Sequence, residues 1–86
     1  MTTVEEVLAL VRTVFGRHVD LPADRVDPDQ PAIALEGIES LKLLRAVAEI
    51  EDTLGVAIPD EVLLDDMTLR ALAEVVVGLP RRTGIR

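Results

Sequence analysis

The chain has 86 residues, 49% of them apolar, which is enough for one domain and not for two. It contains no cysteine, so disulfides and thiolate metal sites are excluded, and any thiol chemistry requires an added cofactor. Sixteen acidic and nine basic residues give a net charge of −7. A field of that sign repels phosphate backbones and argues against a nucleic-acid partner.

The N-terminal segment does not have the pattern of a secretory leader, because two threonines and two glutamates precede any apolar run. No stretch approaches the roughly 20 consecutive apolar residues that a membrane span needs. We therefore expect a soluble, cytoplasmic protein that has no membrane partner.

The first predicted element is an amphipathic helix over residues 3–17. Thr3 and Glu6 have the spacing of a capping box, in which each side chain accepts a hydrogen bond from a free backbone N–H. Gly16 or His18 is expected to end this helix. Its apolar residues recur every three or four positions and define one face, formed by Val4, Val7, Leu8, Val11, Val14 and Phe15.

Residues 18–37 are predicted to form a long loop, because three prolines and four aspartates interrupt any helical period. A loop of this length is uncommon in a compact domain unless it is functional or fixed to the core. We expect it to lie across the helices, held by four isolated apolar residues: Leu21, Val26, Ile33 and Leu35.

A second long helix is predicted over residues 39–54. One apolar stripe, which we assign to the core, consists of Leu43, Val47, Ile50 and Leu54. Leu41, Leu44 and Ala48 fall on an adjacent face at the same helical spacing. That second face is either a contact surface or part of a wide buried face, and periodicity alone does not separate the two.

The last third of the chain is predicted to hold one short and one longer helix. Gly55 fits a helix C-terminal cap, and Pro59 prevents the helix from continuing. Residues 60–66 are expected to form a short helical turn with acidic ends. Thr68 can cap a final helix that reaches about Val77. The residues of that helix expected to face inward are Leu69, Leu72, Val75 and Val76.

Ser40 is the only serine, and it falls in the first turn of the second predicted helix. It lacks a Gly-x-Ser-x-Gly elbow, and no lysine follows three residues later, so the common hydrolase motifs fail. His18, the only histidine, is expected in the first loop region and on the surface. Asp27 and Asp29 are spaced like the start of a calcium loop, but Ala32 stands where that loop needs glycine, so we expect no metal site.

The segment from Gly37 to Asp60 resembles the carrier-protein family, which comprises acyl carrier proteins and the related thiolation (peptidyl carrier) domains. The family signature Gly-x-Asp-Ser-Leu is matched by Gly37-Ile38-Glu39-Ser40-Leu41. Further residues in the family's register are Glu51, Leu54, Gly55, Ile58, Pro59, Asp60, Thr68, Leu69 and Leu72.

The resemblance covers about residues 3–79 and implies an all-α, acyl-carrier-protein-like four-helix bundle with a long first loop, three of its helices being main helices and one short. We expect a monomeric carrier domain over residues 1–80, followed by a basic tail over residues 81–86.

The resemblance also implies that Ser40 carries a covalent 4′-phosphopantetheine arm, with Glu39 and Leu41 beside it. A phosphopantetheinyl transferase would attach the arm from coenzyme A with magnesium. Acyl or aminoacyl groups would travel on it as thioesters between separate loading, condensing and tailoring enzymes, and the carrier itself would catalyse nothing. The partner-contact residues that we expect are Leu41, Lys42, Leu44, Arg45, Ala48, Asp65 and Asp66.

Two departures from the family pattern bear on the kind of carrier. Glu39 replaces aspartate, and its longer side chain is a poorer helix cap. Lys42 and Arg45 lie where fatty-acid carriers tend to be acidic, which favours a dedicated set of partners. Peptidyl carriers usually show Gly-Gly-x-Ser-Leu, whereas Ile38 stands here in place of the second glycine and Gly37 is the only adjacent one. This favours a discrete acyl carrier of a polyketide or related specialised pathway.

Two alternatives stay open on the sequence. One is a free-standing peptidyl (aminoacyl) carrier. The other is an unmodified adaptor that keeps the carrier fold and acts only in docking, through acidic residues such as Glu49, Asp65 and Asp66.

Overall fold

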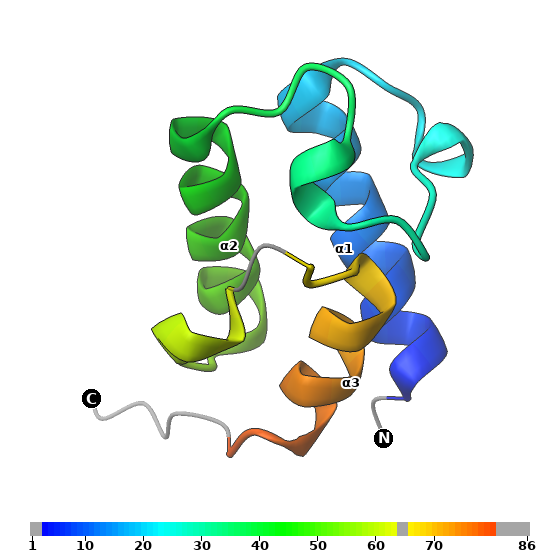
Figure 1. Cartoon of the computed structure of the whole chain (residues 1–86). Helices are drawn as coiled ribbons and strands as arrows, with labels where there is room; N and C mark the ends of the chain where they lie inside the picture. The colour runs from blue at the N-terminus through cyan, green and yellow to red at the C-terminus, as the bar shows by residue number, and fades with distance from the viewer. Residues whose placement is uncertain (1–2, 64–65, 81–86) are drawn as a thin grey trace.

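The computed structural model describes residues 3–63 and 66–80, and it forms a bundle of three α-helices (Figure 1). These helices are α1 (Val4–Val19), α2 (Ser40–Leu54) and α3 (Leu69–Gly78). Three single-turn 3-10 helices join them, namely η1 (Ala23–Arg25), η2 (Ala32–Ala34) and η3 (Asp60–Val62). No strand occurs within the described ranges, so the predicted all-α class is confirmed.

Of the predicted short fourth helix, the described residues show the single turn η3. It begins after Pro59, which has an extended backbone, and it covers three residues of the expected 60–66. Leu64 and Asp65 lie outside the described residues.

α1 begins as the capping-box pattern predicted. The Thr3 hydroxyl accepts a hydrogen bond from the Glu6 backbone N–H at 3.2 Å, and the Glu6 carboxylate accepts one from the Thr3 backbone N–H at 2.8 Å. The predicted end, at Gly16 or His18, was wrong. The helix continues to Val19 and closes at Asp20, which adopts a left-handed φ of 61° and donates its N–H to the Gly16 carbonyl.

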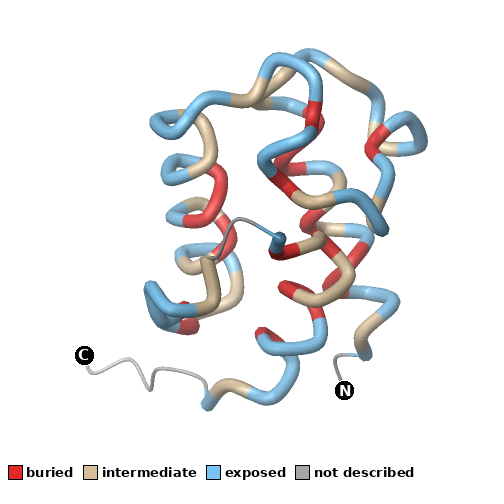
Figure 2. Tube along the Cα trace, in the orientation of Figure 1, coloured by how far each residue is buried: buried red, intermediate tan, exposed pale blue. Residues whose placement is uncertain are grey.

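Most of the residues that the periodicity assigned to the core are buried, and in Figure 2 the buried segments of the three helices turn towards the middle of the bundle. α1 buries five of the six predicted residues, and Val4 packs against their cluster. Val75 of α3 is a correction, since it is 37% exposed. It precedes Val76 by one residue, which turns it about 100° away from the buried face.

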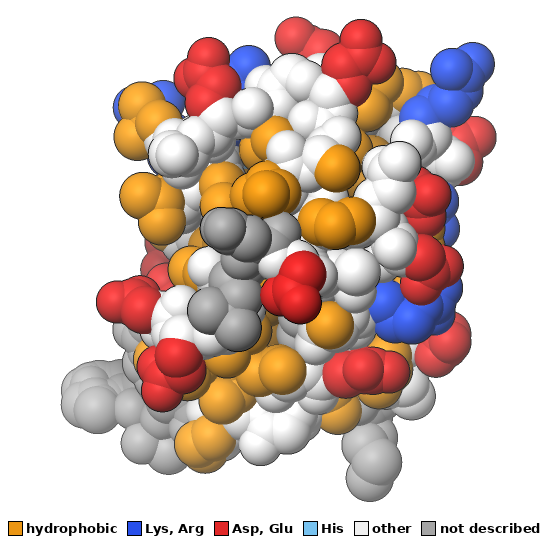
Figure 3. Space-filling view, viewed as in Figure 1, with side chains coloured by type: hydrophobic (Ala, Val, Ile, Leu, Met, Phe, Trp, Pro, Cys, Tyr) orange, Lys and Arg blue, Asp and Glu red, His pale blue; other side chains and the backbone are white. Residues whose placement is uncertain are grey.

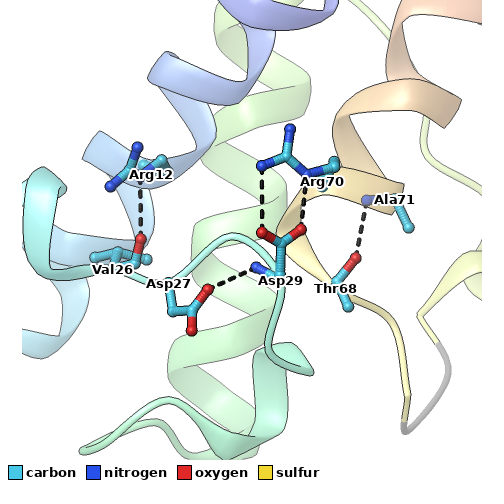
Figure 4. A network of polar contacts seen from close by, with 7 residues as sticks. All are labelled: Arg12, Val26, Asp27, Asp29, Thr68, Arg70 and Ala71. Carbon is cyan, nitrogen blue, oxygen red and sulfur yellow. Dashed lines mark hydrogen bonds and ion pairs between the residues drawn. The ribbon is translucent and has the colours of Figure 1, made fainter.

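The loop between α1 and α2 lies across the helices, as expected, and polar contacts fasten its first half (Figure 4). Arg12 of α1 donates its Nε–H to the Val26 carbonyl at 3.0 Å. Arg70 of α3 donates two hydrogen bonds to the Asp29 carboxylate, at 2.7 and 3.3 Å. The Ala32 N–H donates to the Met67 carbonyl at 2.7 Å, next to an isolated bridge that pairs residues 31 and 68.

The four apolar residues of the loop do not all serve as anchors. Val26 and Leu35 are buried, and Leu21 is half-buried against the core. Ile33, which we also expected to contact the core, is 51% exposed. It is the middle residue of η2, whose buried residue is Ala32, so the turn directs Ile33 outward.

The structure resolves the two faces of α2 that the sequence left open. Val47 and Ile50 of the predicted stripe are buried, and Leu43 and Leu54 are half-buried against the core cluster. The second face, formed by Leu41, Leu44 and Ala48, is exposed. Gly55 ends the helix in a left-handed conformation with φ of 67°, as predicted.

Candidate functional site

Ser40 is the first residue of α2, and it is exposed. The loop turns into the helix at Gly37, whose φ of 87° is a conformation that other residues rarely adopt. A turn follows in which the Ile38 N–H donates to the Leu35 carbonyl at 3.1 Å. These constraints place the Ser40 hydroxyl at the start of the helix, where an approaching enzyme can reach it.

The start of α2 is open. Glu39 occupies the N-cap position with an extended backbone, and its carbonyl accepts the Leu43 N–H at 2.8 Å. Among the described residues, however, no capping hydrogen bond to its side chain is formed. The first backbone N–H groups of α2, together with the positive end of the helix dipole, therefore remain available to an anion bonded to Ser40.

A shallow pocket of ≈ 250 Å³ adjoins Ser40. Most of its lining is apolar, and Glu39 adds a carboxylate. The complete lining is Ile33, Ile38, Glu39, Ser40 and Leu43. Sequence reasoning missed Ile33, which it assigned to the core, and it gave Ile38 no role. The only sequence signal was the position of Ile38 inside the Gly-x-Glu-Ser motif.

The exposed face of α2 begins directly after Ser40. Leu41 and Leu44 are 55% and 56% exposed. Figure 3 shows hydrophobic side chains at the surface over α2, at the left of the view. Lys42 donates a hydrogen bond to the Gly37 carbonyl at 3.3 Å, so its ammonium is held over the loop that leads into the helix. Arg45 is exposed, and no ion pair to it occurs within residues 3–63 and 66–80.

An ion-pair cluster joins α1 and α2 further along. The Glu49 carboxylate accepts hydrogen bonds from the Arg17 guanidinium and, at 3.1 Å, pairs with His18 Nε2. The hydrogen bond from Arg17, followed by that from His18, lowers the pKa of Glu49. Our expectation for His18 was wrong: it lies in the last turn of α1 and is half-buried, because Glu49 holds it against α2.

Of the two acidic residues expected at the partner surface, the structure describes only Asp66. Asp65 lies outside the described residues. Asp66 is exposed and lines a separate cavity of ≈ 320 Å³, which shares no residue with the pocket beside Ser40. The structure therefore brings Glu39, Ser40 and Leu43 together at one pocket and places Asp66 at another. Besides Asp66, the residues that line the ≈ 320 Å³ cavity are Glu61, Val62, Met67, Ala71 and Val75.

Neither a metal-ligand cluster nor a membrane-spanning helix occurs in the described ranges. No group of three or more histidine, cysteine, aspartate or glutamate residues there could hold a metal ion. None of the helices in the same ranges has both the length and the apolar character to cross a membrane.

Comparison with known proteins supplies the family. The family model described as "Phosphopantetheine attachment site" matches residues 5–76, and the chain belongs to this family. Comparisons with curated proteins and with solved structures found no significant match.

Members of this family carry a covalently attached 4′-phosphopantetheine, so the chain is a carrier that tethers acyl groups through such an arm. The residues present fit that group. Ser40 offers an exposed hydroxyl, and the open start of α2 offers hydrogen-bond donors to a phosphate.

Proposed function

We propose that this protein is an acyl carrier whose 4′-phosphopantetheine arm is attached to Ser40, and that it serves a polyketide or related specialised biosynthetic pathway. The observation that carries the proposal is the position of the only serine. It is exposed, it begins an uncapped helix, and it lies within the part of the chain that matches the phosphopantetheine attachment family.

The chemistry assigned to Ser40 is phosphoester formation. In a phosphopantetheinyl transferase, the Ser40 oxygen bonds to the pantetheine-linked phosphorus of the coenzyme A pyrophosphate, the pyrophosphate P–O bond breaks so that adenosine 3′,5′-bisphosphate leaves, and a base of the transferase takes the serine proton. The product phosphodiester bears a negative charge, which the first N–H groups of α2 stabilise. When bound, the arm supplies the thiol that the cysteine-free chain lacks.

The partner surface that we propose is the exposed face that follows Ser40, comprising Leu41, Lys42, Leu44, Arg45 and Ala48. Leu41 and Leu44 provide apolar area for a partner to cover. The charge beside them supports a dedicated partner set, because exposed charges control on-rate and specificity. Asp66 belongs to the expected surface by resemblance, but it lines a different cavity.

The basic character of this face depends on Glu49. A glutamate four residues after Arg45 would ordinarily be positioned to pair with it. Here Arg17 and His18 of α1 engage the Glu49 carboxylate instead. Arg45 is therefore left to a partner, and the ion pairs of Glu49 argue against its use as the acidic docking residue of an unmodified adaptor.

The extent of the carrier unit is also a proposal. We place it at residues 1–80, with residues 81–86 as a basic tail. The last helix ends at Gly78, and the family match ends at residue 76, which supports a boundary near residue 80. A chain shortened after residue 80 should therefore still accept the arm.

Intact mass spectrometry tests the attachment. The protein is incubated with coenzyme A, magnesium and a broad-specificity phosphopantetheinyl transferase, and the wild type should gain the mass of one phosphopantetheine. Ser40→Ala should gain none. Thr53→Ala is the matched control, because Thr53 is an exposed hydroxyl residue of the same helix and its loss should leave the gain intact. A wild type that stays unmodified would favour the adaptor.

A further inference from the structure

We infer that the pocket beside Ser40 binds the first part of the phosphopantetheine arm, which is the branched dimethyl segment next to the phosphate. In this inference, Ile33 forms one side of the pocket and contacts that segment specifically. The inference rests on the proposed attachment at Ser40. It assigns a ligand role to Ile33, Ile38 and Leu43, which lie outside the expected partner surface.

The position of the pocket favours this occupant. Ser40 is itself part of the lining, so a group bonded to its hydroxyl starts at the pocket. The dimethyl segment lies one carbon from the phosphate ester oxygen and is the nearest bulky apolar group along the arm. A tethered group has an effective concentration of the order of millimolar, so that even a pocket of low affinity becomes occupied.

The size and lining of the pocket fit the same segment. An apolar cavity of about 150 Å³ holds benzene, and the pocket here measures ≈ 250 Å³. It therefore holds a branched five-carbon unit with room for its neighbours. An acyl chain is attached beyond two amide units, at the far end of the arm, so it does not start at this pocket.

Ile33 is exposed on a turn that the fold holds in place. The Ala32 N–H donates to Met67, the Ala34 N–H donates to the Pro31 carbonyl at 2.9 Å, and Asp29 pairs with Arg70 just upstream. A half-exposed isoleucine on a fixed turn keeps apolar area in water, and covering that area is favourable. The pocket is thus already formed before the arm is attached to Ser40.

Glu39 is the charged residue of the pocket lining. Among the described residues, its side chain takes no part in capping α2. It can accept a hydrogen bond from the hydroxyl that follows the dimethyl group on the arm. The longer side chain, a poor helix cap, is therefore suited to a second use at the pocket.

The test compares the unmodified and modified protein by methyl NMR with labelled isoleucine and leucine. In the modified protein, the methyl signals of Ile33, Ile38 and Leu43 should shift, and nuclear Overhauser effects should connect them to the dimethyl protons of the arm. Leu44, which points to the outer face, should show no contact with the arm. A mass gain at Ser40 without these contacts overturns the inference and leaves the proposed function standing, whereas absence of the mass gain defeats both.

Matched variants separate the pocket from the neighbouring surface. Ile33→Ser and Leu44→Ser each replace an apolar residue that is about half exposed, so neither should unfold the protein. Ile33→Ser should abolish the contacts between the arm and Ile38, and the dimethyl signals should then relax as those of a freely moving group. Leu44→Ser should keep these contacts. An equal loss of the contacts between the arm and Ile38 in both variants would contradict a specific contribution of Ile33 to the pocket.

Discussion

The first turns of α2 and α3 both follow irregular segments, yet they are completed in opposite ways. The N-cap residue of α3 is Thr68, whose hydroxyl accepts the Ala71 N–H at 3.0 Å, and Arg70 links the same turn to Asp29 of the loop (Figure 4). The N-cap residue of α2 is Glu39, whose side chain, within the part of the chain described, makes no capping hydrogen bond.

The difference separates a structural helix start from one that is available to a ligand. A capped start has its donors satisfied within the chain, so it contributes stability and has little left to offer an anion. An open start gives up that contribution but keeps its N–H groups and dipole for binding. α2 must then be held in place by its packed inner face and by the Gly55 cap at its other end.

Truncation of that inner face should have the largest effect. Ile50 is completely buried, so Ile50→Ala should lower the free energy of unfolding by about 2–5 kcal/mol through loss of contacts and formation of a cavity. Leu44→Ala removes a similar side chain from the exposed face and should change it by less than about 0.5 kcal/mol. Urea denaturation followed by circular dichroism measures both. Similar losses in the two variants would mean that the outer face of α2 is not solvent-exposed.

Removal of the α3 cap should have the next largest effect. Thr68→Ala should lower the free energy of unfolding by about 1 kcal/mol, because the Ala71 N–H loses its acceptor. Glu39→Ala at the start of α2 should leave stability almost unchanged, since no cap is lost. The same denaturation experiment compares the two variants, and a larger loss for Glu39→Ala would reverse the distinction between the helix starts.

The α2 start can also be closed by substitution. Aspartate is a strong N-cap residue, so Glu39→Asp should raise the free energy of unfolding by about 0.5 kcal/mol. The shorter carboxylate should also leave the pocket beside Ser40 less enclosed. Methyl NMR of the modified protein would report this as weaker contacts between the arm and the pocket. Thermal denaturation detects the gain in stability. An unchanged midpoint would indicate that the loop geometry before Ser40 prevents any side chain from capping this helix.

The smallest effect expected is the acid dependence at the α3 start. The hydrogen bond from Arg70 lowers the pKa of Asp29 below its ordinary value. A lowered folded-state pKa means that this contribution is complete above the unfolded pKa, about 3.9, and is lost as the pH falls through the lower folded value. Asp29→Asn should therefore flatten the stability profile below about pH 4. Asp24→Asn, at an exposed carboxylate of η1, is the control and should keep the wild-type profile.

Local patterns were sufficient to predict what local interactions determine. The capping box of Thr3 and Glu6, the Thr68 cap, the Gly55 cap and the buried stripe containing Ile50 depend on residues within one or two turns of each other. The exposure of Leu41 and Leu44 was left undecided, because two apolar faces on one helix have the same period whichever of them is buried.

Two of the errors lie where distant segments meet, and one is local. His18 is held by Glu49, 31 residues further along. Ile33 was misplaced for a related reason, since η2 takes its orientation from Met67. The local error is the end of α1, which extends past Gly16 because the left-handed turn at Asp20 completes the helix. The candidate site shows the same division: the motif around Ser40 could be read from the sequence, but the pocket beside it could not, because Ile33 of its lining comes from the loop.

The chain has a single phenyl ring, that of Phe15, and it is completely buried in the core. The phenylalanine contribution to the near-ultraviolet dichroism and the phenyl ring-proton resonances therefore come from one known place in the molecule. With tryptophan and tyrosine absent, the only other aromatic ring is the imidazole of His18. The protein thus contains a natural probe of interior order, through which any distant perturbation that loosens the packing can be followed without an added label.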